Sequence, residues 1–229
     1  MFEKFMEAWR SKGLLNQALE KTQAMIETVA KTYSYVREYL LHGVKPDVDV
    51  YGRDRFVNHL NREIRRLIAE HLVVKPGDNP MAGLVLLNVN IDLERVGDFT
   101  KNLYEVAVAY PGPILESKYH RLAELLATEE LVKDGFGLTL KGFMELDAGA
   151  AQQVLVNHKN VSAKTNELIN ELFVKTDLSV KDAVMAVLVC RYLKRISAHL
   201  MNVASTVINP FDWVSYQYDG DPADAKELD

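Results

Sequence analysis

Hydrophobic residues recur at three- and four-residue steps along most of the chain, and this spacing is typical of one face of an α-helix. It predicts long helices over residues 14–41, 49–73, 81–109, 114–146, 148–174 and 180–208. Short breaks rich in proline and glycine separate several of them, as at 76–80 and 111–113. No stretch shows the strict alternation of a half-buried strand. We therefore predict an all-α fold of six long helices with short connections.

Local signals mark several of the predicted helix ends. Asn79 suits an N-cap and Pro80 the first position of the third helix, because proline lacks the N–H that would be unpaired there. Asp147 is a candidate cap for the fifth helix, and the Ser-x-x-Asp spacing of Ser179 and Asp182 predicts the start of the sixth. Three glycines predict a kink in the fourth helix: Gly135, Gly137 and Gly142.

The two halves of the chain resemble each other. The third and sixth helices align at an offset of one hundred residues, which pairs Arg95 with Arg195 and Asn102 with Asn202. The second and fifth helices align at an offset of one hundred and four residues. We interpret this as a duplicated three-helix unit, so that two tandem three-helix bundles form the fold. The expected divisions are a first repeat over 1–112, a second repeat over 113–209 and a C-terminal tail over 210–229.

Composition narrows the class of protein. The net charge is -5, and a mildly acidic chain is a poor binder of nucleic acid or anionic lipid. The single cysteine, Cys190, excludes a disulfide scaffold and a cysteine-rich zinc site; we expect it to be a buried structural thiol in a reducing compartment. Charged residues near the N-terminus argue against a signal peptide, and no apolar run is long enough for a membrane span. These features predict a cytoplasmic protein that is not an integral membrane protein.

Acidic and amide side chains share one face of the third predicted helix, at steps of four, four and three residues: Glu94, Asp98, Asn102 and Glu105. Asp54 and Asn58 are four residues apart on the second predicted helix. Oxygen ligands from two packed helices are a common way for a bundle to hold a metal ion, whereas acidic residues at helical spacing more often form a solvated face. Gly97 lies between them and marks either close helix packing or the approach of a ligand.

This acidic segment carries a family resemblance. Residues 93–98, Leu-Glu-Arg-Val-Gly-Asp, followed by Asn102 and Glu105, resemble the Leu-Glu-Arg-Ile-Gly-Asp…Asn-Ile-Ala-Glu signature of the PhoU family. Residues 54–58, Asp-Arg-Phe-Val-Asn, resemble its Asp-x-x-Ile-Asp motif, with asparagine in the second acidic place. The similarity extends over residues 14–208, including the order of the two repeats.

The resemblance implies a cytoplasmic, non-enzymatic regulator of phosphate uptake and phosphate signalling. Such a protein is often a homodimer and acts by contact with a phosphate transporter component or its sensor kinase. Some family members bind multinuclear iron or zinc clusters. Carried over by position, the metal ligands here would be Glu94, Asp98 and Asp54, with Asn58 and Asn102 as weaker candidates.

The second repeat departs from the family pattern. The residues at the places of Glu94, Gly97, Asp98, Asp54 and Asn58 are, in that order, Lys194, Ser197, Ala198, His158 and Ser162. A lysine ammonium repels a metal cation, so we expect no second cluster of the family type.

The sequence is also compatible with other functions and leaves the role of two surface segments open. The chain could serve a sodium-coupled phosphate transporter, act as a metal-dependent helical-bundle enzyme, or be a dimerisation bundle without a ligand. No paired Glu-x-x-His segments support the enzyme. Arg62, Arg65 and Arg66 form either a solvated face or a contact for an acidic partner. The aromatic residues Phe211 and Trp213 of the tail either pack on the bundle or contact a partner.

Overall fold

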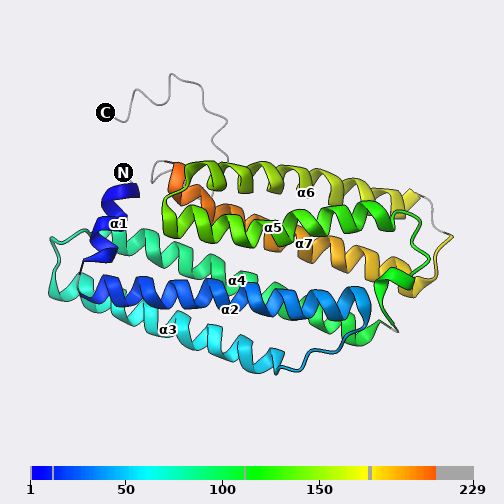
Figure 1. Ribbon diagram of the computed structural model, residues 1–229, viewed down its shortest axis with the longest axis horizontal. Helices are drawn as coiled ribbons and strands as arrows, with labels where there is room; N and C mark the ends of the chain where they lie inside the picture. Colours follow the sequence, from blue (N-terminus) through cyan, green and yellow to red (C-terminus); the bar gives the residue numbers. More distant parts are fainter. Residues whose placement is uncertain (1, 12, 111, 175–176, 210–229) are drawn as a thin grey trace, which may run out of the picture.

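The computed structural model describes residues 2–11, 13–110, 112–174 and 177–209, and the predicted tail with its aromatic cluster lies outside them. No strand occurs in these ranges. The elements are seven α-helices and one 3-10 turn (Figure 1): α1 (Phe2–Arg10), α2 (Leu14–His42), α3 (Val50–Val74), α4 (Pro80–Ala109), η1 (Ile114–Glu116), α5 (Leu122–Glu145), α6 (Ala148–Val174) and α7 (Val180–Ile208). The all-α prediction is confirmed, and its six long helices are α2 to α7.

The long helices form two three-helix bundles that lie side by side. In the first bundle α2 packs against both α3 and α4, and in the second α5 packs against both α6 and α7. α4 runs along α7 and joins the bundles, and α2 also touches α5, so α3 and α6 lie at opposite edges (Figure 1). None of the described helices is long and apolar enough to cross a membrane.

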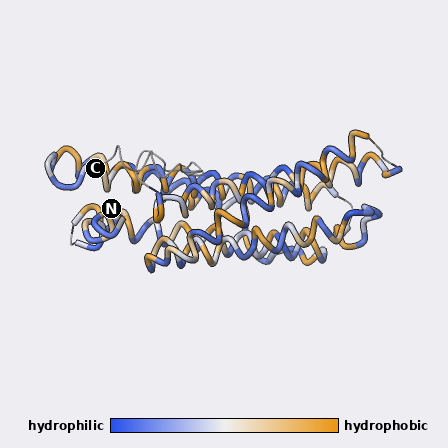
Figure 2. The backbone as a smooth tube through the Cα atoms, turned by 90° about the horizontal axis from the view of Figure 1, so that it is seen from above, coloured by the Kyte–Doolittle hydropathy of each residue, from blue (hydrophilic) through white to orange (hydrophobic). Residues whose placement is uncertain are grey.

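The predicted apolar stripes form the core. Along each helix hydrophobic and hydrophilic residues alternate at short intervals (Figure 2), so every helix turns one side to its neighbours and another to water. Fully buried side chains come from every long helix, and each stabilises the fold by about 1.5–3 kcal/mol: among them Ile26, Ile64, Leu93, Phe143, Leu168 and Ile196.

The contact between α4 and α7 is itself repeated. His199 Nδ1 of α7 lies 2.8 Å from Asp92 Oδ1 of α4. At the positions one hundred residues away, the rings of Phe99 and Tyr192 lie with their centroids 6.2 Å apart. Residue 92 therefore meets residue 199 while residue 192 meets residue 99, which supports the interpretation that the chain arose by duplication.

Helix α1 lies within the predicted first repeat, but the six expected helices do not include it. The helix is held by burial of Met6 and Trp9, which are 1% and 0% exposed. Trp9 Nε1 donates to the carbonyl of Ala82 at 2.9 Å, and its ring contacts that of Phe143 at 5.5 Å between centroids. Both partners are distant in the sequence, so these contacts cannot be read from the local pattern.

The fourth predicted helix begins later than expected. Instead of a helix from residue 114, the chain makes the single turn η1 and starts α5 at Leu122. Ile114 and Tyr119 are 1% and 3% exposed, so this segment buries two large side chains against the bundle while its backbone is extended at Ser117. The burial of these side chains outweighs the helical spacing of the sequence.

The predicted helix starts have mixed outcomes. Ser179 Oγ accepts from the Asp182 amide at 3.1 Å, and Asp147 Oδ1 accepts from the Ala150 amide at 2.9 Å, so both caps are confirmed. Asn79 and Pro80 take the predicted N-cap and first positions of α4, but the Asn79 side chain donates to Asp78 and makes no cap hydrogen bond. Its backbone is left-handed, with φ 52°, instead of the extended conformation usual for an N-cap.

The glycines of the fourth predicted helix do not interrupt it, because α5 is continuous from Leu122 to Glu145. Gly142 has a packing role instead. A Cβ at this position would lie 3.2 Å from the backbone nitrogen of Ala151, so the glycine lets α5 and α6 approach closely.

Candidate functional site

The candidate residues of the first repeat meet where α3 and α4 pack on α2. A Cβ on Gly97 would lie 3.4 Å from Val57 Cγ1 of α3 and 3.5 Å from Val29 Cγ1 of α2. Of the two roles expected for this glycine, close helix packing is therefore the one that the contacts show. The close packing places Asp54 of α3 beside Asp98 of α4.

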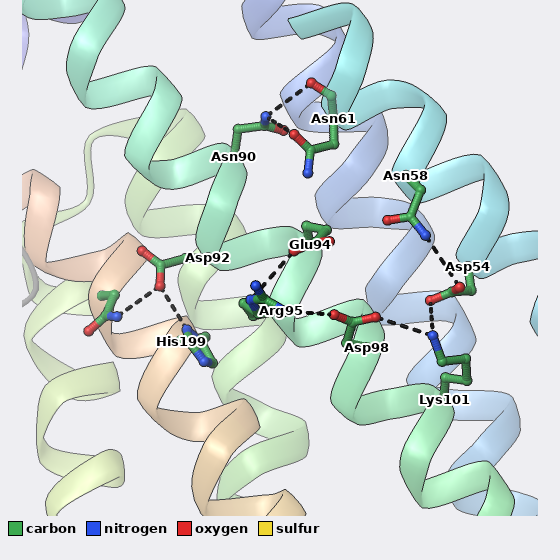
Figure 3. A network of polar contacts seen from close by, with 11 residues as sticks. Asp54, Asn58, Asn61, Asn90, Asp92, Glu94, Arg95, Asp98, Lys101 and His199 are labelled. Carbon is green, nitrogen blue, oxygen red and sulfur yellow. Dashed lines mark hydrogen bonds and ion pairs between the residues drawn. The ribbon is translucent and has the colours of Figure 1, made fainter. Parts of the chain in front are cut away.

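A lysine lies between these two carboxylates (Figure 3). Lys101 Nζ is 3.1 Å from Asp54 Oδ1 and 3.2 Å from Asp98 Oδ1. The three side chains are between 14% and 27% exposed, so water screens the interaction only in part. The structure thus brings together two of the predicted ligands, with a protein cation at the point where they converge.

The protonation of Lys101 follows from its partners. Burial lowers the pKa of the ammonium group, but the hydrogen bonds and charges of Asp54 and Asp98 outweigh burial and raise the pKa above its ordinary value. The group therefore stays positively charged at neutral pH, and it neutralises part of the carboxylate charge.

The other predicted ligands surround this ion pair. Asn58 Nδ2 donates to Asp54 Oδ2 at 3.4 Å, and Arg95 Nη1 donates to Asp98 Oδ2 at 3.1 Å. Arg95 also lies 3.6 Å from Glu94 Oε2 (Figure 3). We call Asp54, Asn58, Glu94, Asp98 and Lys101 the first-repeat cluster. Asn102 is half-buried, and among the described residues no hydrogen bond or ion pair joins it to the cluster.

An iron or zinc cluster needs several ligand side chains that converge on one point. Within the described residues, no three histidine, cysteine, aspartate or glutamate side chains gather in a way that would hold a metal ion. Asp54 and Asp98 both direct an oxygen at Lys101, and Glu94 is turned toward Arg95. In this arrangement Lys101 and Arg95 bind the carboxylates that the family resemblance assigns to a metal, and the metal ligands stay a prediction.

The sequence reasoning missed Lys101 and Arg95 as partners of the predicted ligands. A signal for both was present, because each lies three residues from Asp98 and such pairs face each other on a helix. The contact of Lys101 with Asp54 had no such signal, since it depends on how α3 packs against α4.

Two further polar networks hold the repeats together. In the first, Asp92 Oδ1 accepts hydrogen bonds from His199 and Asn202, both at 2.8 Å, across α4 and α7. The second crosses from α2 to α5. Glu129 is 3% exposed and pairs through both carboxylate oxygens with Arg37 Nε at 2.9 Å, and Tyr33 donates to it at 2.9 Å.

Burial dominates the electrostatics of the α2–α5 network. It raises the pKa of Glu129, although Arg37 and the hydrogen bond from Tyr33 act in the opposite direction. Burial also raises the pKa of Tyr33 well above its usual range. Glu129 and Tyr33 are buried while Arg37 is partly exposed and also pairs with Glu130 at the surface, and we assign the network to the contact between the bundles.

At the equivalent place in the second repeat, α6 and α7 carry different polar groups. His158 Nδ1 lies 3.2 Å from Ser197 Oγ, and Lys194 Nζ donates to Asn166 Oδ1 at 2.9 Å. Burial, and then the positive charge of Lys194, lower the pKa of His158, so the imidazole is neutral at neutral pH. We call His158, Ser162, Lys194 and Ser197 the second-repeat cluster.

The remaining candidates from the sequence have simpler environments. Cys190 is 0% exposed, and burial raises the pKa of its thiol to about 12, so the expectation of a buried structural thiol is confirmed. Arg62, Arg65 and Arg66 are exposed on α3, where both the solvated face and the partner contact remain open.

Comparisons with known proteins point to one family. The model of the PhoU domain matches residues 126–207, which lie in the second repeat. The chain is 26% identical over 213 residues to a phosphate-specific transport system accessory protein PhoU homolog of Thermotoga maritima, a match that covers 85% of this chain and 78% of the relative.

Solved structures of PhoU proteins share the fold. PhoU from Pseudomonas aeruginosa superposes with a TM-score of 0.72 at 21% identity, over 85% of this chain and 95% of that one. The regulatory protein PhoU from Streptococcus pneumoniae gives 0.68 at 13% identity, over 91% and 95% of the two chains. The predicted resemblance to the PhoU family is thereby confirmed: residues 126–207 match the PhoU domain, and the chain has the fold of PhoU proteins.

Proposed function

We propose that the chain regulates phosphate uptake by binding another protein, either a component of a phosphate transporter or the sensor kinase that works with it. The observation that carries the proposal is the agreement of fold and sequence with PhoU proteins over 85% of the chain, including a relative named as an accessory protein of phosphate-specific transport. We place its action in the cytoplasm and assign it no catalytic step.

The geometry of the site supports a binding role over catalysis. In the first-repeat cluster, Asp54 and Asp98 share the same ammonium group, so neither carboxylate is free to act as a general base. The surface of α3 carries three exposed arginines at residues 62, 65 and 66. Such cations suit an acidic protein surface, and they are the first contact that we would test.

Co-purification tests the proposed partner contact. The tagged chain is mixed with detergent-solubilised membranes of the native host, from phosphate-rich and phosphate-starved cultures, and the retained proteins are identified. Retention of a phosphate transporter component or a sensor kinase in either condition supports the proposal. Retention of neither in both conditions contradicts it.

A charge-reversal variant locates the contact. Arg62→Glu combined with Arg66→Glu should weaken retention if α3 meets the partner. Arg10→Glu is not a suitable control, because Arg10 donates to the carbonyl of Met144. Arg191→Glu and Arg195→Glu, exposed on α7, provide a matched change of charge on the other repeat.

We keep metal binding in the first repeat and a homodimer as two separate proposals that rest on the family resemblance. For the metal, elemental analysis compares the purified chain with the Glu94→Ala/Asp98→Ala and Lys101→Ala variants. Because Lys101 holds the place between two carboxylates, Lys101→Ala should increase the bound iron or zinc if the carboxylates can act as ligands. For the homodimer, sedimentation equilibrium gives the mass directly.

A further inference from the structure

An apolar groove lies open at the end of the molecule where α4 ends and α7 begins (Figure 1). Its volume is about 240 Å³. Although Val184 belongs to its wall, this side chain is 51% exposed. A pocket of this kind is where an interface buries a bulky apolar side chain of another segment. Side chains of both helices form the wall: Val106, Ala109, Tyr110, Val184, Met185 and Leu188.

The groove has one cationic side chain in its wall, and this cation is free for an external carboxylate. Lys181 is exposed and forms no ion pair among the residues that the structure describes. The next residue, Asp182, accepts hydrogen bonds from the hydroxyls of Tyr110 at 2.5 Å and of Ser179 at 2.7 Å. Its carboxylate is thus engaged by neutral groups of the chain. The groove therefore suits a large apolar side chain that is flanked by acidic residues.

The tail over residues 210–229, which lies outside the described residues, has this composition. Its first part is aromatic and includes Phe211, Trp213, Tyr216 and Tyr218. Residues 219–229 then contain five acidic side chains and one lysine. A tryptophan buries about 150–250 Å² of surface, more than any other side chain of the tail offers. Trp213 is thus the side chain of the tail that suits the groove best.

The length of the chain decides which groove Trp213 can occupy. Helix α7 has 29 residues, and Ile208 lies about 30 Å along its axis from Leu188, the nearest residue of the groove wall. An extended chain advances about 3.3–3.6 Å per residue, so the backbone of Trp213 lies at most about 18 Å from Ile208. Trp213 therefore falls short of the groove of its own chain. A second copy that lies antiparallel brings the end of its α7 beside this groove.

We propose that the tail of one copy binds in the α4–α7 groove of a second copy. The Trp213 indole fills the groove, and the acidic residues of the tail lie near Lys181. With the two copies antiparallel about a two-fold axis, each chain donates one tail and receives one. The inference rests on the homodimer proposed above and adds the contact that holds it together.

Fluorine magnetic resonance on the full chain, labelled with 5-fluorotryptophan, tests the contact. The chain has two tryptophans, and Trp213→Phe assigns their signals. Trp9 is 0% exposed, so its signal reports that the fold is intact. The Trp213 signal should shift as the protein concentration rises, and a soluble paramagnetic probe should broaden it less. Both changes should follow the fraction of dimer measured by sedimentation equilibrium.

Matched variants locate the contact. Trp213→Ala removes the aromatic side chain and Val184→Asp places a charge in the groove, so each should weaken the dimer about tenfold or more. Val156→Asp is the control, because Val156 is 43% exposed on α6 outside the groove. It should leave the dimer unchanged.

A mixture of two variants tests whether the tail binds in the other copy. Trp213→Ala keeps an intact groove, and Val184→Asp keeps an intact tail. The mixture should form dimers more readily than either variant alone, because each mixed pair retains one complete contact. No gain on mixing would contradict exchange of the tails.

Three further results would overturn the proposal. One is a dimer that is as strong in Trp213→Ala and Val184→Asp as in Val156→Asp. Another is a Trp213 signal that is shielded from the probe in the monomer, which would show that the tail packs on its own bundle. The third is a Trp213 signal that stays open to the probe in the dimer. A chain that is monomeric at every concentration would contradict the homodimer as well, so failure of the two proposals is distinguishable.

Discussion

In the first repeat an ammonium group lies between two carboxylates, whereas in the second an ammonium group lies beside a neutral imidazole and a hydroxyl. Both clusters lie where two helices of a three-helix bundle meet, so the same backbone arrangement supports opposite charges. The buried apolar residues determine that arrangement, and the polar residues at the surface of the contact can differ between repeats. A family motif in one repeat therefore does not predict the site of the other.

Removal of Lys101 from the first-repeat cluster should have the largest effect on the stability of the fold. Lys101→Ala leaves Asp54 without its cation and Asp98 with Arg95 alone, and we expect the free energy of unfolding to fall by about 1–3 kcal/mol. Urea denaturation at pH 7 measures the change. Lys133→Ala, which removes an exposed ion pair with Glu130, is the control and should leave the midpoint almost unchanged. Equal effects of the two variants would show that the first-repeat cluster is fully screened by water.

Gly97→Ala should have the next largest effect, with the opposite sign. The added methyl group would make ordinary contacts with Val57 and Val29, and alanine favours a helix over glycine by up to about 1 kcal/mol. We expect a gain in stability of up to about 1 kcal/mol, measured by the same denaturation. In Gly142→Ala the methyl would press on the backbone of Ala151, and that variant should lose stability. A loss of stability in Gly97→Ala would show that α2, α3 and α4 cannot move apart enough to accept a methyl group.

Removal of Lys194 should change stability less than removal of Lys101. Lys194→Ala breaks a hydrogen bond to an amide and leaves no carboxylate unpaired, so we expect a change below about 0.5 kcal/mol. The pKa of His158, followed by its ring signals, should rise because a nearby positive charge is removed. An unchanged pKa would mean that Lys194 and His158 do not interact in solution.

The smallest expected effect is on the pH dependence of stability. Burial and Lys194 hold the pKa of His158 below its ordinary value of 6.5 in the folded chain, so protonation favours the unfolded state. The neutral imidazole of His158 therefore contributes to stability above pH 6.5, and this contribution is lost as the pH falls through the lower pKa of the folded chain. His158→Gln should flatten the unfolding free energy between pH 7 and 5.

Local patterns in the sequence predicted the features that depend on nearby residues. The six long helices and the caps at Asp147 and Ser179 follow from helical spacing and from residues three positions apart. α1 and the late start of α5 did not follow, because they depend on the burial of Trp9 and Tyr119 against distant parts of the chain.

The same distinction applies to the candidate site. Helical spacing correctly indicated which residues share a face of α4, yet the position of Lys101 between Asp54 and Asp98 needs the packing of two helices. The substitutions of the second repeat were visible in the sequence. The structure adds that Lys194 has no carboxylate partner among the described residues and bonds Asn166 instead.

The central claim, that the chain regulates phosphate uptake, is tested most directly by the rate of phosphate uptake in the native host with the gene deleted. Cells are grown in phosphate-rich and phosphate-starved medium, and uptake of radioactive phosphate is measured with and without a restored copy of the gene. Deletion should change uptake in at least one medium, and the restored copy should reverse the change. Identical uptake in both media with and without the gene would contradict it.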